Sequence, residues 1–409
     1  MTQCLTTRRS LLKTLGAGAA ASMLPLSGPT KPSARKPNIV FILADDLGYG
    51  DLSCYGQQRF RTPNIDRLAA EGMRFTQHYS GSTVCAPSRC CLMTGLHTGH
   101  CQIRGNGPVE PEGQTPMRPG TLTIPRLLRT AGYVSGMFGK WGLGGPGSTS
   151  DPLEHFDEFC GYNCQRIAHD YYPEYLWHNA KKVMLDGNTY SHGLIMDAAL
   201  RFITANRDRP FFCYLPVTIP HAAMSAPREL HEKYRRRYSQ FEHIEKEYGE
   251  TVVRNPIAAF PAMIERLDED VGRLTNLLAD LGIDDNTIVI FTSDNGPHSE
   301  GGHDPHFWNS SGPLRGRKRS LYEGGIRVPF IARWKGRISP ASVSNHVSAF
   351  WDLLPTIGEA AHVATPEHID GISLLPELLG KPQLEHDYLY WEFAKGGGRQ
   401  AIRKGRYKA

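Results

Sequence analysis

Short apolar runs alternate with amphipathic segments along the chain from Pro37 onward. The run Asn38–Ala44 is apolar on both faces, which is typical of a strand buried inside a parallel sheet. Four later runs have the same character, at 133–138, 211–217, 287–292 and 328–334. Because helical patterns separate these runs, the sequence predicts an α/β fold with a large, mostly parallel sheet flanked by helices.

Helices are predicted where apolar residues recur every three or four positions. The clearest covers 261–281, where one face is apolar and the other carries charged residues that can face water, among them Asp268. Shorter helices are predicted at 64–71 and 123–130, each ended by a glycine. Long loops, which are usually functional in a compact domain, are predicted at 143–192 and 296–320.

The first 36 residues are predicted to be an export signal and linker. They contain no acidic residue, carry the adjacent pair Arg8 and Arg9, and continue into a mildly apolar run from Leu15 to Leu26. The paired arginines resemble a twin-arginine signal, which the bacterial twin-arginine export machinery recognises. The apolar run is too short to span a bilayer stably. We therefore expect no stable membrane anchor and a bacterial protein that is periplasmic or secreted.

Composition narrows the classes of function further. The 409 residues are 40% hydrophobic and 21% charged, as in an ordinary globular protein. The formal net charge is +5, but much of this excess lies in the predicted signal, so nucleic acid is not expected as a partner. The nine cysteines include no C-x-x-C pair, which argues against a zinc ribbon or a disulfide-dense scaffold.

Polar side chains follow four of the predicted strands. They are Asp45 with Asp46, Lys140, His221, and Asp294 with Asn295. In open α/β sheets, ligands bind beyond the carboxyl ends of the strands. One shared site therefore explains these polar residues better than four unrelated local roles do. Three carboxylates and an amide favour Ca²⁺ or Mg²⁺ over Zn²⁺. A metal beside lysine implies an anionic ester as substrate.

A candidate nucleophile lies elsewhere, in the pentapeptide C-A-P-S-R at 85–89. Proline in the first turn predicts that Cys85 begins a helix, where free backbone N–H groups favour an anion. Arg89 lies one turn further on and is expected to point to the same place. As a plain thiol, Cys85 could act as a thiolate nucleophile.

The pentapeptide resembles the signature of the type I sulfatases, arylsulfatase-like enzymes of the alkaline phosphatase superfamily, in which this cysteine is oxidised to formylglycine. Other segments resemble family motifs in the family's order, at 36–56, 62–66, 139–141, 293–296 and 312–329. The resemblance covers the chain from about residue 36 to its end. It implies an alkaline-phosphatase-like fold and a sulfuric ester hydrolase that depends on a formylglycine-generating enzyme.

The resemblance also implies a role for each matching residue. The hydrated aldehyde made from Cys85 attacks sulfur with one hydroxyl, and its second hydroxyl then expels sulfate. The metal, usually Ca²⁺ although Mg²⁺ is possible, is expected to be bound by Asp45, Asp46, Cys85, Asp294 and Asn295. The remaining catalytic residues are Arg89, which holds the modified cysteine, Lys140 and Lys318, which bind sulfate, and His221, the candidate general acid, a task that Lys318 could share.

Two departures from the family pattern stand out. The family commonly has a histidine after G-K-W, where this chain has Gly142; His303 or His169 could compensate, and both are candidate substrate residues. Family members also carry a small carboxy-terminal α+β domain. We expect a catalytic domain over 37–385 and, at 386–409, only the start of such a subdomain.

The preferred substrate is a sulfate monoester of a carbohydrate or glycan, because exported bacterial sulfatases often act on sulfated glycans. An aryl sulfate is the second choice. A formylglycine-dependent phosphoester or phosphonate ester hydrolase is the nearest enzymatic alternative. A pseudoenzyme that binds sulfate without turnover is the non-enzymatic alternative, although the joint presence of Cys85, Arg89, Lys140, His221 and Lys318 argues against it.

Overall fold

A ten-stranded mixed sheet forms the centre of the computed structural model, which describes residues 35–395 and 397–409. The predicted export signal lies outside the described residues, apart from its last two positions. In spatial order the strands are β13 (Ser342–Ser344), β2 (Met73–Phe75), β12 (Phe330–Trp334), β11 (Thr287–Ser293), β1 (Asn38–Ala44), β8 (Phe211–Pro216), β4 (Val134–Lys140), β5 (Glu158–Tyr162), β6 (Tyr175–His178) and β7 (Lys181–Met184).

The central strands β11, β1, β8, β4 and β5 are parallel, as the alternating pattern predicts. Their register brings Ala44 of β1 beside Ser293 of β11, and Leu43 beside Pro216 of β8. The flanking strand pairs β11–β12, β5–β6 and β6–β7 are antiparallel. The carboxyl ends of the five neighbouring parallel strands therefore share one edge of the sheet.

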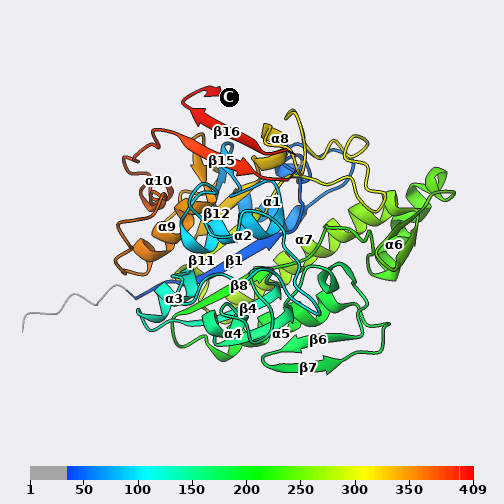
Figure 1. The fold of residues 1–409 in the computed structure, drawn as a ribbon, viewed down its shortest axis with the longest axis horizontal. Coiled ribbons are helices and arrows are strands. Elements are labelled where there is room, and N and C mark those ends of the chain that lie inside the picture. The colour runs from blue at the N-terminus through cyan, green and yellow to red at the C-terminus, as the bar shows by residue number, and fades with distance from the viewer. Residues whose placement is uncertain (1–34, 396) are drawn as a thin grey trace, which may run out of the picture. The chain divides into compact units, whose positions relative to one another are not determined.

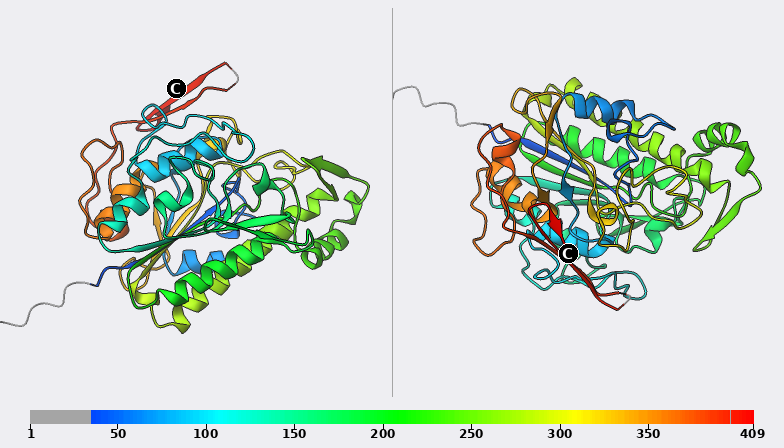
Figure 2. Two further views of the ribbon diagram at one scale, coloured as in Figure 1. Left: turned by 60° about the horizontal axis from the view of Figure 1, so that its bottom comes forward. Right: turned by 90° about the horizontal axis from the view of Figure 1, so that it is seen from above.

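Helices cover both faces of the sheet (Figures 1 and 2). One face packs on α2 (Cys85–Thr94), α3 (Ile124–Arg129) and α9 (Leu353–Ala360). The other packs on α1 (Pro63–Ala70), α5 (Ser191–Ala205) and α7 (Pro256–Asp280). Alternate residues of β1 enter the two cores, so its apolar character on both faces has a direct cause.

Helix α7 corrects two sequence expectations. It starts at Pro256 instead of residue 261, because the Asn255 side chain accepts a hydrogen bond from the backbone N–H of Ala258 at 3.1 Å. Asp268, expected to face water, is buried. Its carboxylate accepts hydrogen bonds from the backbone N–H groups of Asn64 and Ile65 in the first turn of α1.

The predicted loop at 143–192 is also wrong in part. It contains α4 (Pro152–His155), the short 3₁₀ helix η2 (Ile167–His169) and the strands β5, β6 and β7. These strands are only four or five residues long, so they left no extended apolar run in the sequence. The second predicted loop, 296–320, contains no helix or strand and crosses the edge of the sheet that carries the polar residues.

Two smaller units flank the main sheet. Helix α6 (Arg228–Arg237) and the hairpin of β9 (Glu245–Tyr248) and β10 (Thr251–Arg254) project from one end (Figure 1). A three-stranded antiparallel sheet of β15 (Leu389–Phe393), β16 (Arg399–Lys404) and β17 (Tyr407–Lys408) forms the carboxy-terminal part. Trp391 anchors it, donating from Nε1 to the carbonyl of Ser80 at 3.0 Å. No helix in the described residues is both long and apolar enough to cross a membrane.

Candidate active site

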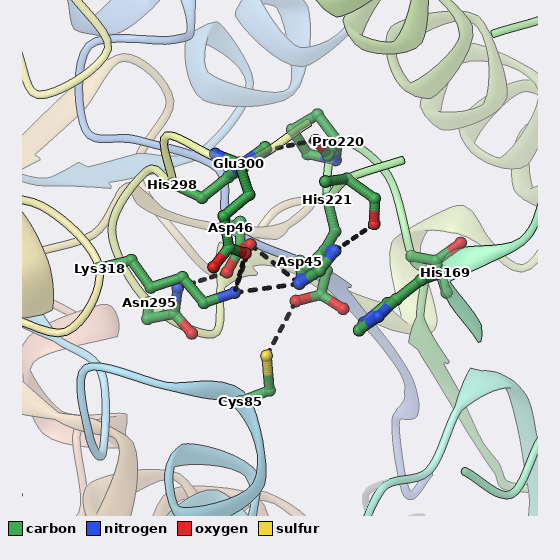
Figure 3. Close-up of polar contacts among 12 residues, drawn as sticks. Asp45, Asp46, Cys85, His169, Pro220, His221, Asn295, His298, Glu300 and Lys318 are labelled. Atoms are coloured by element: carbon green, nitrogen blue, oxygen red, sulfur yellow. Dashed lines mark hydrogen bonds and ion pairs between the residues drawn. The ribbon is translucent and has the colours of Figure 1, made fainter. Parts of the chain in front are cut away.

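The side chains at the carboxyl ends of β1, β4, β8 and β11 meet in one buried cluster. Figure 3 shows those that follow β1, β8 and β11. Its charged members are the carboxylates of Asp45, Asp46 and Asp294 and the cations of Arg89, Lys140 and Lys318. Five of these six side chains have no exposed area, and that of Lys318 is 3% exposed. The structure thus brings together the residues that the sequence placed on separate strands.

Backbone conformations at two strand ends make this convergence possible. Asp46 has a left-handed backbone with φ of 64°, and its N–H donates to Asp294 Oδ1 at 3.1 Å. Asp294 is thereby fixed beside the turn that follows β1. Gly139, before Lys140, has φ of 136°, and a β-carbon there would lie 2.1 Å from the Pro216 carbonyl oxygen. Glycine is therefore required where β4 and β8 pass each other.

Cys85 is the first residue of α2 and points into the cluster, with its Sγ 3.3 Å from Asp45 Oδ1. Burial raises the pKa of the Cys85 thiol well above its usual value, and Asp45 raises it further, although Lys140 and Lys318 oppose the shift. The unmodified thiol is consequently a poor source of thiolate. This arrangement disfavours a plain cysteine nucleophile.

Arg89, one turn along α2, ties the cluster together. Its Nη2 and Nε donate to Asp294 Oδ2 at 2.9 Å and 3.1 Å, and its Nη1 donates to the carbonyl of Lys140. Although burial disfavours its charge, Asp294 and Asp45 outweigh that effect and raise the pKa of Arg89. The guanidinium therefore fixes α2 against the ends of β4 and β11 as a permanent cation.

Each lysine pairs with one of the two adjacent aspartates. Lys140 Nζ lies 2.5 Å from Asp45 Oδ2, and Lys318 Nζ lies 2.6 Å from Asp46 Oδ2. Burial opposes the charge on both lysines, but Asp45 raises the pKa of Lys140 and Asp46 raises that of Lys318. Both lysines are held as ammonium groups with donors to offer an anion.

The oxygen atoms of the cluster fit a hard divalent cation. Asn295 Oδ1 is buried without a hydrogen-bond partner, while its Nδ2 donates to Asp46 Oδ1 at 2.6 Å. Burial raises the pKa of Asp294 to about 7, with Asp45 adding to the shift and Arg89 opposing it. An unpartnered oxygen and an under-compensated carboxylate are both features that a bound cation satisfies. Ligand atoms of Asp45, Asp46, Cys85 and His221 also lie within 4.8 Å of one another.

His221 has a defined tautomer. Its Nδ1 contacts the carbonyl oxygen of Ala222, which can only accept, so Nδ1 carries the proton. Its Nε2 lies 3.0 Å from Lys318 Nζ and 3.2 Å from Asp46 Oδ2, the carboxylate oxygen with which Lys318 also pairs. Burial, followed by the charge of Lys318, lowers the pKa of His221 well below its usual value. The proton shared by this pair accordingly resides on Lys318.

The two candidate substrate histidines have different positions. The ring of His169 stacks on that of His221 with centroids 3.9 Å apart, and its Nε2 lies 3.4 Å from Lys140 Nζ. The ring of His303 instead packs against Phe260 at 4.0 Å, and its Nε2 lies 3.4 Å from Ser310 Oγ. The structure therefore brings His169 to the cluster and places His303 in the packing of the loop behind it.

His298 and Glu300 belong to the site but were missed in the sequence. A nitrogen of His298 and a carboxylate oxygen of Glu300 lie within 4.8 Å of Asp46 and of each other. His298 is fixed by its Nε2, which donates to the Pro220 carbonyl at 3.1 Å, and by its Nδ1, which accepts from the Glu300 N–H at 3.0 Å. The available signal was their place directly after the D-N-G turn that ends β11.

Comparisons with known proteins agree with this geometry. The family model described as "Sulfatase" matches residues 37–363. N-acetylgalactosamine-6-sulfatase of Canis lupus familiaris is 34% identical over 431 residues, covering 98% of this chain and 74% of the relative. Arylsulfatase A of Homo sapiens is 35% identical over 440 residues, covering 98% and 77%.

Solved structures show the same likeness. The crystal structure of Ps i-CgsB in complex with k-i-k-neocarrahexaose matches with a TM-score of 0.79 and 28% identity, covering 92% of this chain and 84% of that one. The phosphonate monoester hydrolase of Agrobacterium radiobacter matches with a TM-score of 0.64 and 21% identity, covering 91% and 86%. The latter likeness is one of fold alone.

Proposed function

The chain belongs to the sulfatase family and is a sulfuric ester hydrolase, and from that premise we propose that it cleaves a sulfate monoester of a carbohydrate with a nucleophile made from Cys85. One observation carries the proposal. Cys85 projects from the start of α2 into a buried cluster of ammonium groups and an unpartnered amide oxygen, with its Sγ 3.3 Å from Asp45 Oδ1, where the sulfatase signature has the cysteine that becomes formylglycine. Conversion to formylglycine supplies the missing nucleophile as a hydrated aldehyde.

We propose that Asp45, Asp46, Asp294 and Asn295, with the modified residue 85, hold one Ca²⁺, with Mg²⁺ as the alternative. Bound there, the cation supplies positive charge next to the nucleophile and the sulfate group. Asp294 would then be ionised at neutral pH, because the cation compensates the burial that raises its pKa to about 7. Arg89 lies on the same helix as residue 85 and donates two hydrogen bonds to Asp294. It therefore holds the Asp294 carboxylate in a fixed position relative to residue 85.

The charge balance of the cluster suits a sulfate group. Asp45, Asp46 and Asp294 are matched in number by Arg89, Lys140 and Lys318. Glu300, at the edge of the site, pairs with Arg319, so the residues alone are neutral when His221 is neutral. A divalent cation makes the site positive, which attracts a sulfate ester and matches the charge of a sulfate dianion. Lys140 and Lys318 can each turn an N–H from their aspartate partner to a sulfate oxygen.

Protonation of the leaving oxygen is assigned to the pair of Lys318 and His221. Lys318 Nζ holds the proton in the resting protein and lies 3.0 Å from His221 Nε2. When Lys318 turns to the sulfate group, its proton can reach the leaving oxygen directly or through His221 Nε2. His221 remains oriented because its Nδ1–H is held by the Ala222 carbonyl.

Relatives support a carbohydrate as the alcohol part of the substrate. One similar protein is named an N-acetylgalactosamine-6-sulfatase, and one similar structure contains k-i-k-neocarrahexaose. The likeness to arylsulfatase A keeps an aryl sulfate as the second candidate. A panel containing N-acetylgalactosamine 6-sulfate, a sulfated galactan oligosaccharide and 4-methylumbelliferyl sulfate separates them by kcat/KM.

Mass spectrometry of the peptide that carries residue 85, combined with a sulfate-release assay, tests the proposed nucleophile. Protein co-expressed with a formylglycine-generating enzyme should carry the aldehyde and release sulfate, and protein made without that enzyme should do neither. Full activity in a preparation whose Cys85 is wholly unmodified would refute the mechanism. A phenyl phosphonate ester run in parallel checks the phosphonate alternative.

Chelation tests the metal. Dialysis against EGTA should reduce turnover and lower the Tm, since a bound cation stabilises the folded state. Readdition of Ca²⁺ should restore both, and Mg²⁺ in place of Ca²⁺ shows which ion the site prefers. Unchanged turnover in protein shown by elemental analysis to be metal-free would contradict the assignment.

We also propose export by the twin-arginine pathway to the periplasm or beyond. The support is the Arg8–Arg9 pair ahead of an Ala/Gly-rich apolar run. Replacement of both arginines by lysine should keep the enzyme in the cytoplasm, as measured by cell fractionation. Export that continues unchanged would contradict the assignment.

A further inference from the structure

A buried amide without a partner lies beside Gly142. Gln165 is 6% exposed, and its Nε2 has no hydrogen-bond partner in the described residues. A β-carbon built on Gly142 would lie 3.3 Å from this nitrogen. An unpartnered buried donor is costly, so its presence needs a cause, and a missing ligand is one such cause.

The segment that carries Gln165 is attached to the catalytic edge of the sheet. It follows β5, and the Tyr162 carbonyl at the end of β5 accepts from the Trp141 N–H at 3.0 Å. The same segment continues into η2, which places His169 Nε2 3.4 Å from Lys140 Nζ. Gln165 and His169 therefore approach the Gly139–Gly142 turn together, next to the lysine assigned to sulfate.

The local backbone fixes where the amide lies. The N–H of Ala168 donates to the Cys164 carbonyl at 3.3 Å, and the N–H of Ile167 contacts Cys164 Sγ at 3.4 Å. These contacts close a turn over residues 164–168 that contains Gln165. Gly142 adds no side chain and has φ of 73°, which leaves room for the amide. The space that a longer residue at 142 would fill is thus available to Gln165.

We propose that Gln165 donates a hydrogen bond from Nε2 to a sulfate oxygen of the bound substrate. It would supply from the neighbouring loop a donor that Gly142 cannot offer. The inference rests on the sulfate-cleaving function of this site. It adds a sulfate-binding residue that was not among the candidates found in the sequence.

A purely structural role explains the geometry less well. A glutamine that only holds the loop together would donate from its Nε2 to an oxygen of the protein, as Gln102 does to the Thr121 hydroxyl Oγ1 at 2.8 Å. A residue that only fills space would be better as leucine, because leucine leaves no amide unpaired. A loop-holding role therefore predicts that Gln165→Leu lowers the Tm, whereas a space-filling role and a sulfate-binding role both predict an equal or higher Tm. Only a loss of sulfate affinity separates the last two roles.

The test compares Gln165→Leu and Gln165→Glu with the wild-type enzyme, prepared with the same formylglycine content. Without ligand, the leucine variant should melt at or above the wild-type Tm. Inorganic sulfate should bind it about 10- to 100-fold more weakly by calorimetry, the range expected for one hydrogen bond to a charged group. Its kcat/KM should fall by a similar factor for 4-methylumbelliferyl sulfate and for a sugar sulfate alike.

The glutamate variant should lose more than the leucine variant, because it places a carboxylate next to the sulfate oxygens. Gln102→Leu is the matched control: it removes hydrogen bonds to Thr121 and Arg118 and should lower the Tm without changing sulfate affinity.

Three results would overturn the proposal: a sulfate affinity of Q165L within twofold of wild type, a loss confined to the sugar substrate, or an unaltered Q165E enzyme. Because inorganic sulfate binding needs no turnover, it tests Gln165 even if the wild-type protein hydrolyses none of the esters offered.

Discussion

Two regions of the molecule are rich in basic side chains, and they differ in burial and pairing. The buried cluster around Asp45 holds its lysines and arginine at 3% exposure or less, each within 3.4 Å of a carboxylate. The carboxy-terminal sheet instead contributes exposed or half-exposed cations to an open cavity of about 970 Å³. These cations are Arg399, Arg403, Arg406 and Lys408. Lys408 is the exception among them, because its Nζ lies 2.9 Å from Glu323 Oε1 and its side chain is 19% exposed.

The difference shows why net charge is a poor guide to this protein. In the cluster, loss of one partner leaves an uncompensated charge away from water, which costs several kcal/mol. At the carboxy-terminal sheet, water and salt screen the same residue types, so one charge contributes little. We therefore expect substitution of a paired and buried cation to impair turnover and stability, and substitution of an exposed cation to change both little.

The largest effect is expected from Cys85→Ala. Removal of the nucleophile should lower kcat by about 10⁴-fold or more, by analogy with other covalent enzymes. Stability should change little, since within residues 35–395 and 397–409 the only hydrogen bond of Cys85 Sγ goes to Asp45. Sulfate release and the Tm are the measurements.

Cys90→Ala, in the same buried helix, is the control and should retain turnover. Substantial activity in Cys85→Ala would show that the nucleophile is misassigned.

The second largest effect is expected from Arg89→Met. Asp294 and Asp45 would lose a buried cation, so the free energy of unfolding should fall by about 3–5 kcal/mol. Urea denaturation measures the fall, and turnover should disappear with it because α2 loses its tie to β11. A fall below 1 kcal/mol would mean that the cluster behaves like the molecular surface.

Much of this arrangement could be predicted because it depends on periodicity. The apolar strand Asn38–Ala44 and its parallel neighbours follow from the sequence pattern, and a shared sheet edge then unites Asp45, Lys140 and Asp294. Cys85 at a helix start follows from the proline two positions later.

The parts that could not be predicted depend on contacts between distant segments. Asp268 looked like a solvent-facing helix residue, but it caps a helix that begins some 200 positions earlier. Gln165 and His298 have no periodic signal, since turns place them at the site. His303 and His169 both lie in predicted loops, and their contacts distinguish them: His303 packs against Phe260, whereas His169 lies beside Lys140.

Asp51 shows the effect of burial on a carboxylate that has no ion pair among the described residues. It is fully buried like Asp45 but pairs with no cation in the described part of the chain. Burial raises its pKa to about 7, although hydrogen bonds from Ser310 and Gly48 oppose the shift. Charged Lys140, by contrast, helps to hold the pKa of Asp45 well below its usual range. Between about pH 4 and pH 7 the folded protein keeps the Asp51 proton while the unfolded chain loses it. The contribution of Asp51 to stability therefore falls as the pH rises through this window.

Asp51→Asn should remove this slope. Relative to wild type, the variant should gain roughly 2–4 kcal/mol in the free energy of unfolding between pH 4 and pH 8, measured by urea denaturation at each pH. In wild type the Gly48 N–H donates to Asp51 Oδ2 at 2.7 Å. If the amide nitrogen of the variant occupies the position of Oδ2, this hydrogen bond is lost, and the loss lowers the stability of the variant equally at pH 4 and pH 8. Parallel pH profiles for wild type and variant would show that Asp51 is ionised in the fold.

The smallest effect is expected at the carboxy-terminal sheet, from Arg406→Gln. Arg406 is exposed, and among the residues that the structure describes its guanidinium donates only to the neighbouring Tyr407 hydroxyl, at 2.8 Å. Its removal should change the free energy of unfolding by no more than about 0.5 kcal/mol and leave kcat/KM for 4-methylumbelliferyl sulfate unaltered. The same measurements on Arg89→Met supply the contrast, since both substitutions delete one guanidinium. A loss above 1 kcal/mol for Arg406→Gln would mean that this sheet holds its cations as tightly as the cluster does, and that burial does not separate the two regions.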